Sequence, residues 1–195
     1  MTDLVRWLPP NEYHAKLPRK RIGAGVLLRG SGDRIVAIVP SYKPGLEIPG
    51  GVVETGESPW DAAERELKEE LGIVREGMPL LVVDHVPVAD DGVPEGLLLI
   101  FDGGWLTPDE ERDLRGTDEE VWSVSLYEID EATREMKTWL GRRVRLAFET
   151  AKSVSGPALS AKGHRRPVQS QPPQPAAPDD IPVPALPETA LAESR

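Results

Sequence analysis

The chain of 195 residues contains no cysteine. Disulfide bonds, thiolate metal sites and cysteine nucleophiles are therefore excluded. Long apolar runs are also missing, because the longest run of large apolar residues covers only 97–101, which is far too short to span a bilayer. Residues 1–10 do not combine a positive start with an apolar run, so no signal peptide is predicted. We expect a soluble, cytoplasmic protein.

Basic residues are in deficit, with 23 Lys and Arg against 33 Asp and Glu, and the net charge is −10. Acidic and basic residues balance in the last 40 positions, so the acidity lies in the first 155 residues. Binding to long nucleic acid depends on basic patches, and this charge distribution argues against it. A small nucleotide is not excluded, because a metal ion can join its phosphates to the protein.

The length predicts one domain with room for a core. Composition changes near Gly156, since the last 40 residues hold nine prolines and no aromatic residue. Such a segment buries too little apolar surface to offset its chain entropy. The sequence therefore predicts an N-terminal extension at 1–19, a folded domain at 20–155 and a disordered Pro/Ala-rich tail at 156–195.

Strand-like and helix-like segments mix along the folded part without strict alternation. This order favours a mixed sheet with helices on both faces. Strands are predicted over 22–28, 34–39, 80–88, 96–102 and 120–125, helices over 59–71, 129–139 and 141–153, a short extended piece at 46–48, and a loop or short helix at 107–118.

The helix at 59–71 has clear end signals. Ser58 is a good N-cap, and Pro59 suits the first helical position. Asp61 completes a capping-box pattern, and Gly72 is a natural helix stop. The helix is therefore predicted to run from Pro59 to Leu71.

Three carboxylates share one face of this helix, because Glu66, Glu69 and Glu70 stand at i, i+3 and i+4. Like charges at this spacing cost about 0.2–0.5 kcal/mol per pair, which a hard divalent cation would remove. A solvated acidic face is the simpler interpretation of the helix alone. It does not explain the glycines that flank the helix, nor Glu57 in the loop before it, and the whole pattern favours a metal site.

Residues 51–73 read GVVETGESPWDAAERELKEELGI. Written as G-x5-E-x7-R-E-L-x-E-E-x-G-I, this stretch resembles the signature of the Nudix (MutT-like) hydrolases at every constrained position. The resemblance is strongest here and diffuse over 20–153. It implies an α/β fold, a Nudix-type α/β/α sandwich with a mixed β-sheet and a loop–helix–loop catalytic motif.

The resemblance also implies an activity. Nudix hydrolases cleave the pyrophosphate bond of a nucleoside diphosphate linked to another moiety, such as an oxidised nucleoside triphosphate, an ADP-sugar or a dinucleotide polyphosphate, with Mg²⁺ or Mn²⁺. The implied partner is a small nucleotide derivative, with no long nucleic acid and no membrane, and a homodimer is compatible. The alternatives are a non-catalytic module that senses nucleotide derivatives, which usually lacks glutamates of the motif, and an interaction protein that acts through its tail.

By similarity, Glu69 and Glu70 are the main metal ligands. Glu66 ligates a metal or accepts a proton from water, and the carbonyl of Gly50 adds a ligand, since glycine lets the backbone come close. Glu57 and Arg65 resemble a supporting pair that holds the loop against the helix, although Arg65 could instead touch phosphate.

Nudix enzymes often take a further acidic ligand or base from outside this motif. Glu119 or Glu120, just ahead of a predicted strand, is the candidate, with Glu54 and Glu95 as rivals, and a solvated carboxylate is the simpler interpretation of each. The basic cluster at 19–21 could meet substrate phosphates, although a solvated cluster is the simpler interpretation.

Three aromatic residues could stack on a base, namely Tyr42, Phe101 and Trp105. Core packing or loop anchoring is the simpler interpretation of each. Phe101 and Trp105 nevertheless stand with Glu119 and Glu120 as candidate substrate-binding residues. Trp122 and Trp139 are assigned to the core.

Overall fold

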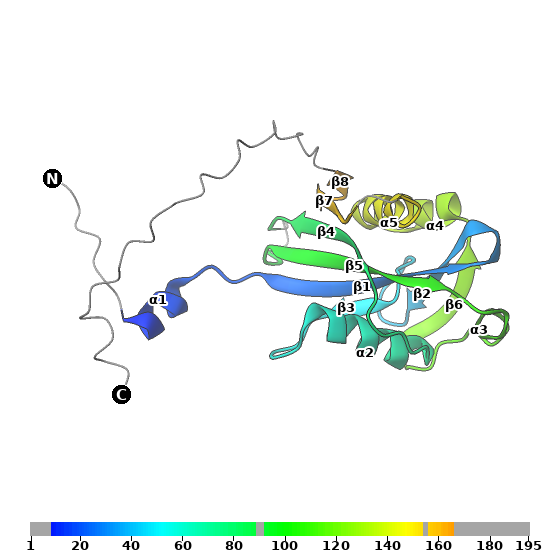
Figure 1. The fold of residues 1–195 in the computed structure, drawn as a ribbon, viewed down its shortest axis with the longest axis horizontal. Coiled ribbons are helices and arrows are strands. Elements are labelled where there is room, and N and C mark those ends of the chain that lie inside the picture. The colour runs from blue at the N-terminus through cyan, green and yellow to red at the C-terminus, as the bar shows by residue number, and fades with distance from the viewer. Residues whose placement is uncertain (1–8, 89–91, 154–155, 166–195) are drawn as a thin grey trace, which may run out of the picture.

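The computed structural model describes residues 9–88, 92–153 and 156–165. One mixed sheet of eight strands lies between two helical layers, with α2 on one face and α4 and α5 on the other (Figure 1). The α/β/α sandwich predicted from the sequence is confirmed. Within the described residues, every helix is too short or too polar to reach across a bilayer.

The strands run in the order β6-β2-β1-β5-β4-β7-β8, and β3 pairs with β1 beside this path. Pairing is antiparallel except between β1 and β5 and between β4 and β7. The strands are β1 (Arg21–Gly30), β2 (Arg34–Pro40), β3 (Gly50–Val52), β4 (Leu80–Val86), β5 (Gly96–Trp105), β6 (Val121–Tyr127), β7 (Ala158–Ala161) and β8 (His164–Arg165).

The helix that carries the acidic face has the predicted bounds, α2 (Pro59–Leu71). Ser58 accepts a hydrogen bond from the backbone N–H of Asp61, and Gly72 ends the helix in the left-handed region at φ 69°. The remaining helices are α1 (Pro10–Lys16), the 3₁₀ turn η1 (Ser31–Asp33), α3 (Pro108–Arg112), α4 (Ile129–Glu135) and α5 (Thr138–Ala151).

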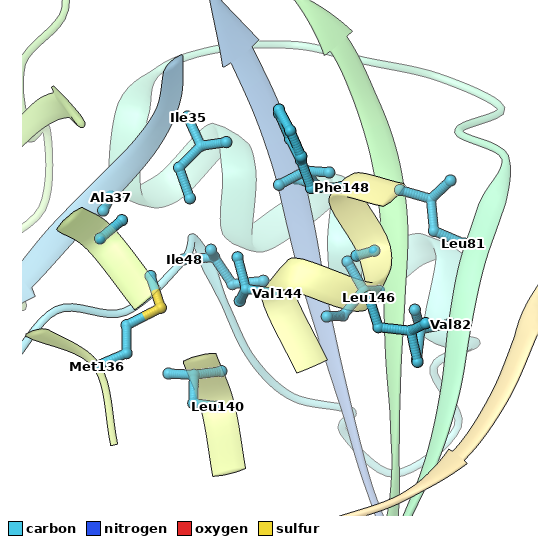
Figure 2. Packing of buried hydrophobic residues seen from close by; sticks show 14 of the residues in the cluster. Ile35, Ala37, Ile48, Leu81, Val82, Met136, Leu140, Val144, Leu146 and Phe148 are labelled. Carbon is cyan, nitrogen blue, oxygen red and sulfur yellow. The ribbon is translucent and has the colours of Figure 1, made fainter. Parts of the chain in front are cut away.

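Each face of the sheet has its own apolar core. Side chains of α5 such as Val144 and Phe148 pack on the sheet beside Ile48 and Val82 (Figure 2). On the opposite face, Leu67 of α2 packs in a second cluster. The sheet is therefore held from both sides, and α2 is fixed against it by burial of one apolar stripe.

The C-terminal boundary expected from composition is wrong. Ala158–Ala161 forms β7, which pairs in parallel with β4, and the hairpin partner β8 follows. The folded domain thus extends beyond residue 155, because Ala158 and Ser160 are small enough to be buried against the sheet. Residues 154–155 and 166–195 of the predicted tail lie outside the described residues. In the N-terminal extension, α1 buries no residue.

Two tryptophans assigned to the core are exposed. The exposed fraction is 79% for Trp122 and 41% for Trp139. Trp122 follows the buried Val121 on β6, and side chains alternate between the two faces of a strand. Trp139 lies in the first turn of α5, and the core contacts of this helix come from later residues such as Val144 and Phe148.

A buried ion pair joins α5 to β4. Asp84 has no exposed surface and accepts two hydrogen bonds from Arg143, from Nε at 2.9 Å and from Nη2 at 2.6 Å. Its other oxygen accepts from the hydroxyl of Ser160 and from the N–H of Gly163 at 2.9 Å. All lone pairs and charges of this carboxylate are thereby matched, which is the condition under which a buried pair is tolerated.

Replacing Asp84 by Asn should lower the free energy of unfolding by about 3–5 kcal/mol, because the buried Arg143 is left without its counter-charge. Asp33→Asn is the matched control, since its ion pair with Lys152 is largely exposed and is worth less than about 1 kcal/mol. Urea unfolding of both variants measures the difference. Equal losses in the two variants would contradict the structural role given to Asp84.

Candidate active site

Two glycines bring β3 against the acidic face of α2. Gly50 has φ 140°, and a Cβ there would lie 2.2 Å from the carbonyl oxygen of Ala24. A Cβ on Gly51 would lie 2.3 Å from Oε1 of Glu66. Only glycine fits at position 50, because a side chain would clash with the backbone of Ala24 and because this φ is strained for other residues. The backbone can therefore approach the helix carboxylates closely.

Glu70 is a buried carboxylate next to this backbone. Its exposed fraction is 8%, and Oε2 accepts a hydrogen bond of 2.8 Å from the N–H of Gly50. The pKa of Glu70 is raised to about 8, mainly by burial and in addition by the charges of Glu66, Glu120 and Glu47, against the opposing effect of the Gly50 bond. Among the described residues no basic side chain pairs with it. The site therefore holds a desolvated acid whose charged form would be stabilised by a bound cation.

Glu66 lies one turn earlier on the same face. Burial raises its pKa, the bond from Arg65 lowers it, and the charges of Glu69 and Glu120 raise it again. Two neighbouring carboxylates thus both resist ionisation in the metal-free chain, because their negative charges are close and partly desolvated.

Arg65 gathers the other acids of the motif. Its guanidinium donates to Glu57 at 2.8 and 3.1 Å, to Glu66 at 2.9 Å and to Glu69 at 2.9 Å. The bond to Glu57, ahead of the other contacts, raises the pKa of Arg65. The contact between Glu57 and Arg65 expected from the sequence is present, and it ties the loop to α2.

The donors here suit a hard divalent ion, because all are oxygens and several are carboxylates. Glu66 and Glu70 both lie against the backbone of Gly50 and Gly51. The charge of Glu120 raises the pKa of both glutamates. Within the described ranges, no three acidic side chains already converge on one point. One oxygen of Glu69 accepts a hydrogen bond from Arg65, as does one oxygen of Glu66.

The acidic candidates outside the motif are separated by their surroundings. Glu119 and Glu120 are both exposed, and of the two it is Glu120 whose charge raises the pKa of Glu66 and Glu70. Glu54 donates its backbone N–H to Glu57. Glu95 pairs with Lys20 at 2.6 Å, away from this group.

A cavity of about 250 Å³ adjoins Gly50 and Gly51 on the side of α5. Tyr42 and Trp139 line it, and 65% of Tyr42 is exposed. Sequence reasoning weighed Tyr42 for stacking and Arg21 for contact with phosphates, but it missed the other lining side chains, since no local pattern joins positions so far apart. They include Lys43, Glu47, Leu98, Leu140 and Arg143.

Phe101 and Trp105 do not line this cavity. Phe101 is fully buried in the core on the α2 face, with its ring 5.9 Å from that of Trp60, so it is not available for stacking. Trp105 ends β5 under the guanidinium of Arg29, 4.9 Å from its ring centroid. It stands five residues beyond Ile100 of the cavity wall, roughly 16 Å along the strand. Phe101 is corrected as a substrate contact because it is buried, and Trp105, which is 50% exposed, stays a prediction outside this cavity.

Comparison with known proteins agrees with the fold. The family described as NUDIX domain matches residues 19–147. No curated protein matches the chain.

Solved structures share the architecture at low identity. A NUDIX hydrolase from Nitrosomonas europaea has a TM-score of 0.58 and 16% identity over 74% of this chain and 80% of that one. A C. elegans Ap4A hydrolase in a binary complex gives 0.56 and 21% over 68% and 98%. The NUDIX domain of Shewanella oneidensis NrtR, complexed with ADP ribose, gives 0.57 and 14% over 74% and 99%. At these identities the likeness concerns the fold alone.

Replacing Glu70 by Gln should stabilise the metal-free protein at alkaline pH. The pKa of Glu70 is about 8 when folded and about 4.3 when unfolded. The folded chain therefore binds the extra proton, and this stabilisation, complete below the lower value, is lost as the pH rises through about 8. Melting temperatures of chelator-treated protein should favour Glu70→Gln increasingly from about pH 5 to about pH 8, and by a constant margin at higher pH.

The exposed Glu76 supplies the control, because Glu76→Gln removes the same charge from a solvated position of the chain. Its melting temperature should follow that of the native chain at every pH. If Glu70→Gln follows it too, the buried charge assigned to Glu70 is wrong.

Proposed function

This chain belongs to the Nudix family and is a Nudix pyrophosphohydrolase, and from that premise we propose a divalent-metal-dependent reaction on a nucleoside diphosphate linked to another group. The observation that carries the proposal is the buried Glu70. Its carboxylate meets the backbone of Gly50 and the charge of Glu66, with no basic partner in the described part of the chain. Such a group fits Mg²⁺ or Mn²⁺ and, through it, phosphate oxygens.

We assign the ligands to Glu66, Glu69, Glu70 and the carbonyl of Gly50. When bound, the metal neutralises charge on the phosphates and activates water. Glu70 offers the oxygen that is not bonded to Gly50, and Glu69 the oxygen that is not bonded to Arg65. The three glutamates supply oxygens from one face of α2, and Gly50 supplies its carbonyl oxygen from β3.

Arg65 and Glu57 keep the loop in place while substrate binds. Four of the five hydrogen bonds of Arg65 go to glutamates and the fifth, at 3.3 Å, to the carbonyl of Val52. A guanidinium engaged in this way positions the motif, and we do not assign it to phosphate. We propose that Glu120 accepts the proton that water loses, with Glu66 as the alternative if it does not ligate the metal.

Three substrate classes follow from the chemistry. The fold is shared with an Ap4A hydrolase and with a domain that holds ADP ribose. We therefore propose dinucleotide polyphosphates and ADP-sugars, together with oxidised nucleoside triphosphates, as the panel for a screen with and without Mg²⁺. Binding without product over hours would instead favour a sensing module.

Glu70→Gln should lower kcat/KM on the panel's best substrate by about 100-fold or more, beyond the roughly 10–100-fold that losing a group outside the metal's own ligands costs. Glu76→Gln serves again as the control and should keep native turnover. Release of phosphate or nucleoside monophosphate gives the rate, and circular dichroism verifies the fold. Unchanged turnover in Glu70→Gln would remove the site assignment.

Substituting Glu119 and Glu120 one at a time distinguishes a functional carboxylate from a solvated one. Glu120→Gln should reduce kcat by about 10-fold or more, as expected for a group that takes part in proton transfer. It should also shift the pH profile to lower pH, because its charge raises the pKa of Glu66 and Glu70. Glu119→Gln should leave both unchanged. Identical profiles for the two variants would contradict the role of Glu120.

A further inference from the structure

The hairpin of β7 and β8 lies beyond the part of the chain that matches the family, which ends at residue 147. β7 pairs with β4 along the strand, and within this pairing the buried Asp84 accepts hydrogen bonds from the hydroxyl of Ser160 and the N–H of Gly163. Gly163 also sits tightly on α5, because a Cβ there would lie 3.0 Å from the carbonyl oxygen of Trp139. The hairpin is thus built onto the first turns of α5.

Asp84 also links the hairpin to the cavity beside the acidic motif. Its second oxygen holds Arg143, whose guanidinium carbon lies 5.0 Å from the ring centroid of Trp139. Both Arg143 and Trp139 line the cavity. An unbroken series of contacts therefore runs from Ser160 through Asp84 and Arg143 to the exposed ring of Trp139.

The charges along the wall decide what it can bind. Arg143 is neutralised by Asp84, and Lys43 pairs with Glu47 at 2.8 Å. Arg21 is the third cation of the lining, and its Nε donates to the carbonyl of Pro94 at 2.9 Å. The wall therefore combines the rings of Trp139 and Tyr42 with three cations, two of which are already neutralised by carboxylates. Aromatic faces of this kind stack on a nucleobase, whereas phosphate needs unpaired donors.

We propose that the β7–β8 hairpin is a positioning element which, through Asp84 and Arg143, holds Trp139 as the wall on which the substrate's nucleobase stacks. The proposal rests on the proposed function, since it takes the cavity beside Gly50 as the place of the substrate's non-reacting group. Trp139 is the stacking residue, and Ser160 acts on the base only through Asp84.

Comparing the binding of ligands that carry a base with the binding of one that lacks it tests this directly. The full chain is titrated by calorimetry, in the presence of magnesium chloride, with the four common nucleoside monophosphates and with ribose 5-phosphate. The best monophosphate should bind about 10-fold more tightly than ribose 5-phosphate, within the range expected for stacking of one base. Trp139→Ala should remove this preference, and Trp139→Phe should retain most of it.

Ser160→Ala tests the hairpin without leaving a buried charge unpaired. It should reduce the preference by about threefold, and the double variant Ser160→Ala/Trp139→Ala should equal Trp139→Ala alone, because the serine acts through the ring. Ser125→Ala, on the exposed side of β6, is the matched control and should change nothing. With a hydrolysed substrate, Ser160→Ala should raise KM and leave kcat unchanged.

A native chain that does not prefer a base overturns the proposal. Additive effects in the double variant, or an effect of Ser160→Ala on kcat with KM unchanged, overturn the role of the hairpin. The binding ratio needs no turnover. A chain that shows it and hydrolyses nothing contradicts the proposed function alone, and hydrolysis without base preference contradicts this proposal alone.

Discussion

Burial of the Glu70 carboxylate against the backbone of Gly50 is the constraint on which the site depends. It requires α2 to hold one fixed position beside β3. The caps at Ser58 and Gly72 contribute by fixing where the helix begins and ends. It also requires a residue without a side chain at position 50, where the backbone of Ala24 is close. A desolvated acid at a helix–strand contact raises the free energy of the metal-free fold, and a bound cation relieves it.

Two buried acids in this domain contrast in a useful way. Asp84 is matched by Arg143, by Ser160 and by an N–H, so its charge is settled within the fold. Glu70 receives one N–H and is surrounded by other acids. The first arrangement is what a structural ion pair needs. The second leaves the compensation to a ligand, and strongly shifted acids of this kind are typical of functional sites.

Local signals predicted much of α2 and its site. Ser58, Pro59 and Gly72 mark the helix ends by their own backbone preferences, and the observed bounds agree. The contact between Glu57 and Arg65 followed from the resemblance and is present. The fold class is confirmed as well, because the order of strand-like and helix-like segments already favoured a mixed sheet between helices.

The rest depended on tertiary contacts that no window of sequence contains. Phe101 is buried in the core on the α2 face, whereas Trp105 on the same strand is half exposed and contacts Arg29. Trp139 joins Tyr42 in a cavity only because α5 crosses the sheet there. The proline-rich composition after residue 155 hid β7, whose small residues are stabilised by a partner strand and by Asp84.

The two-residue strand β8 also bears on how these molecules behave in a crowded solution. It is the last strand of the sheet on that side, next to β7. A long, flat outer strand presents a row of free N–H and C=O groups on which another chain can align, and natural proteins blunt such rows by keeping them short. Within the described residues this row is only two residues long, His164 and Arg165, one of which is always charged. So short a row offers another chain little on which to align.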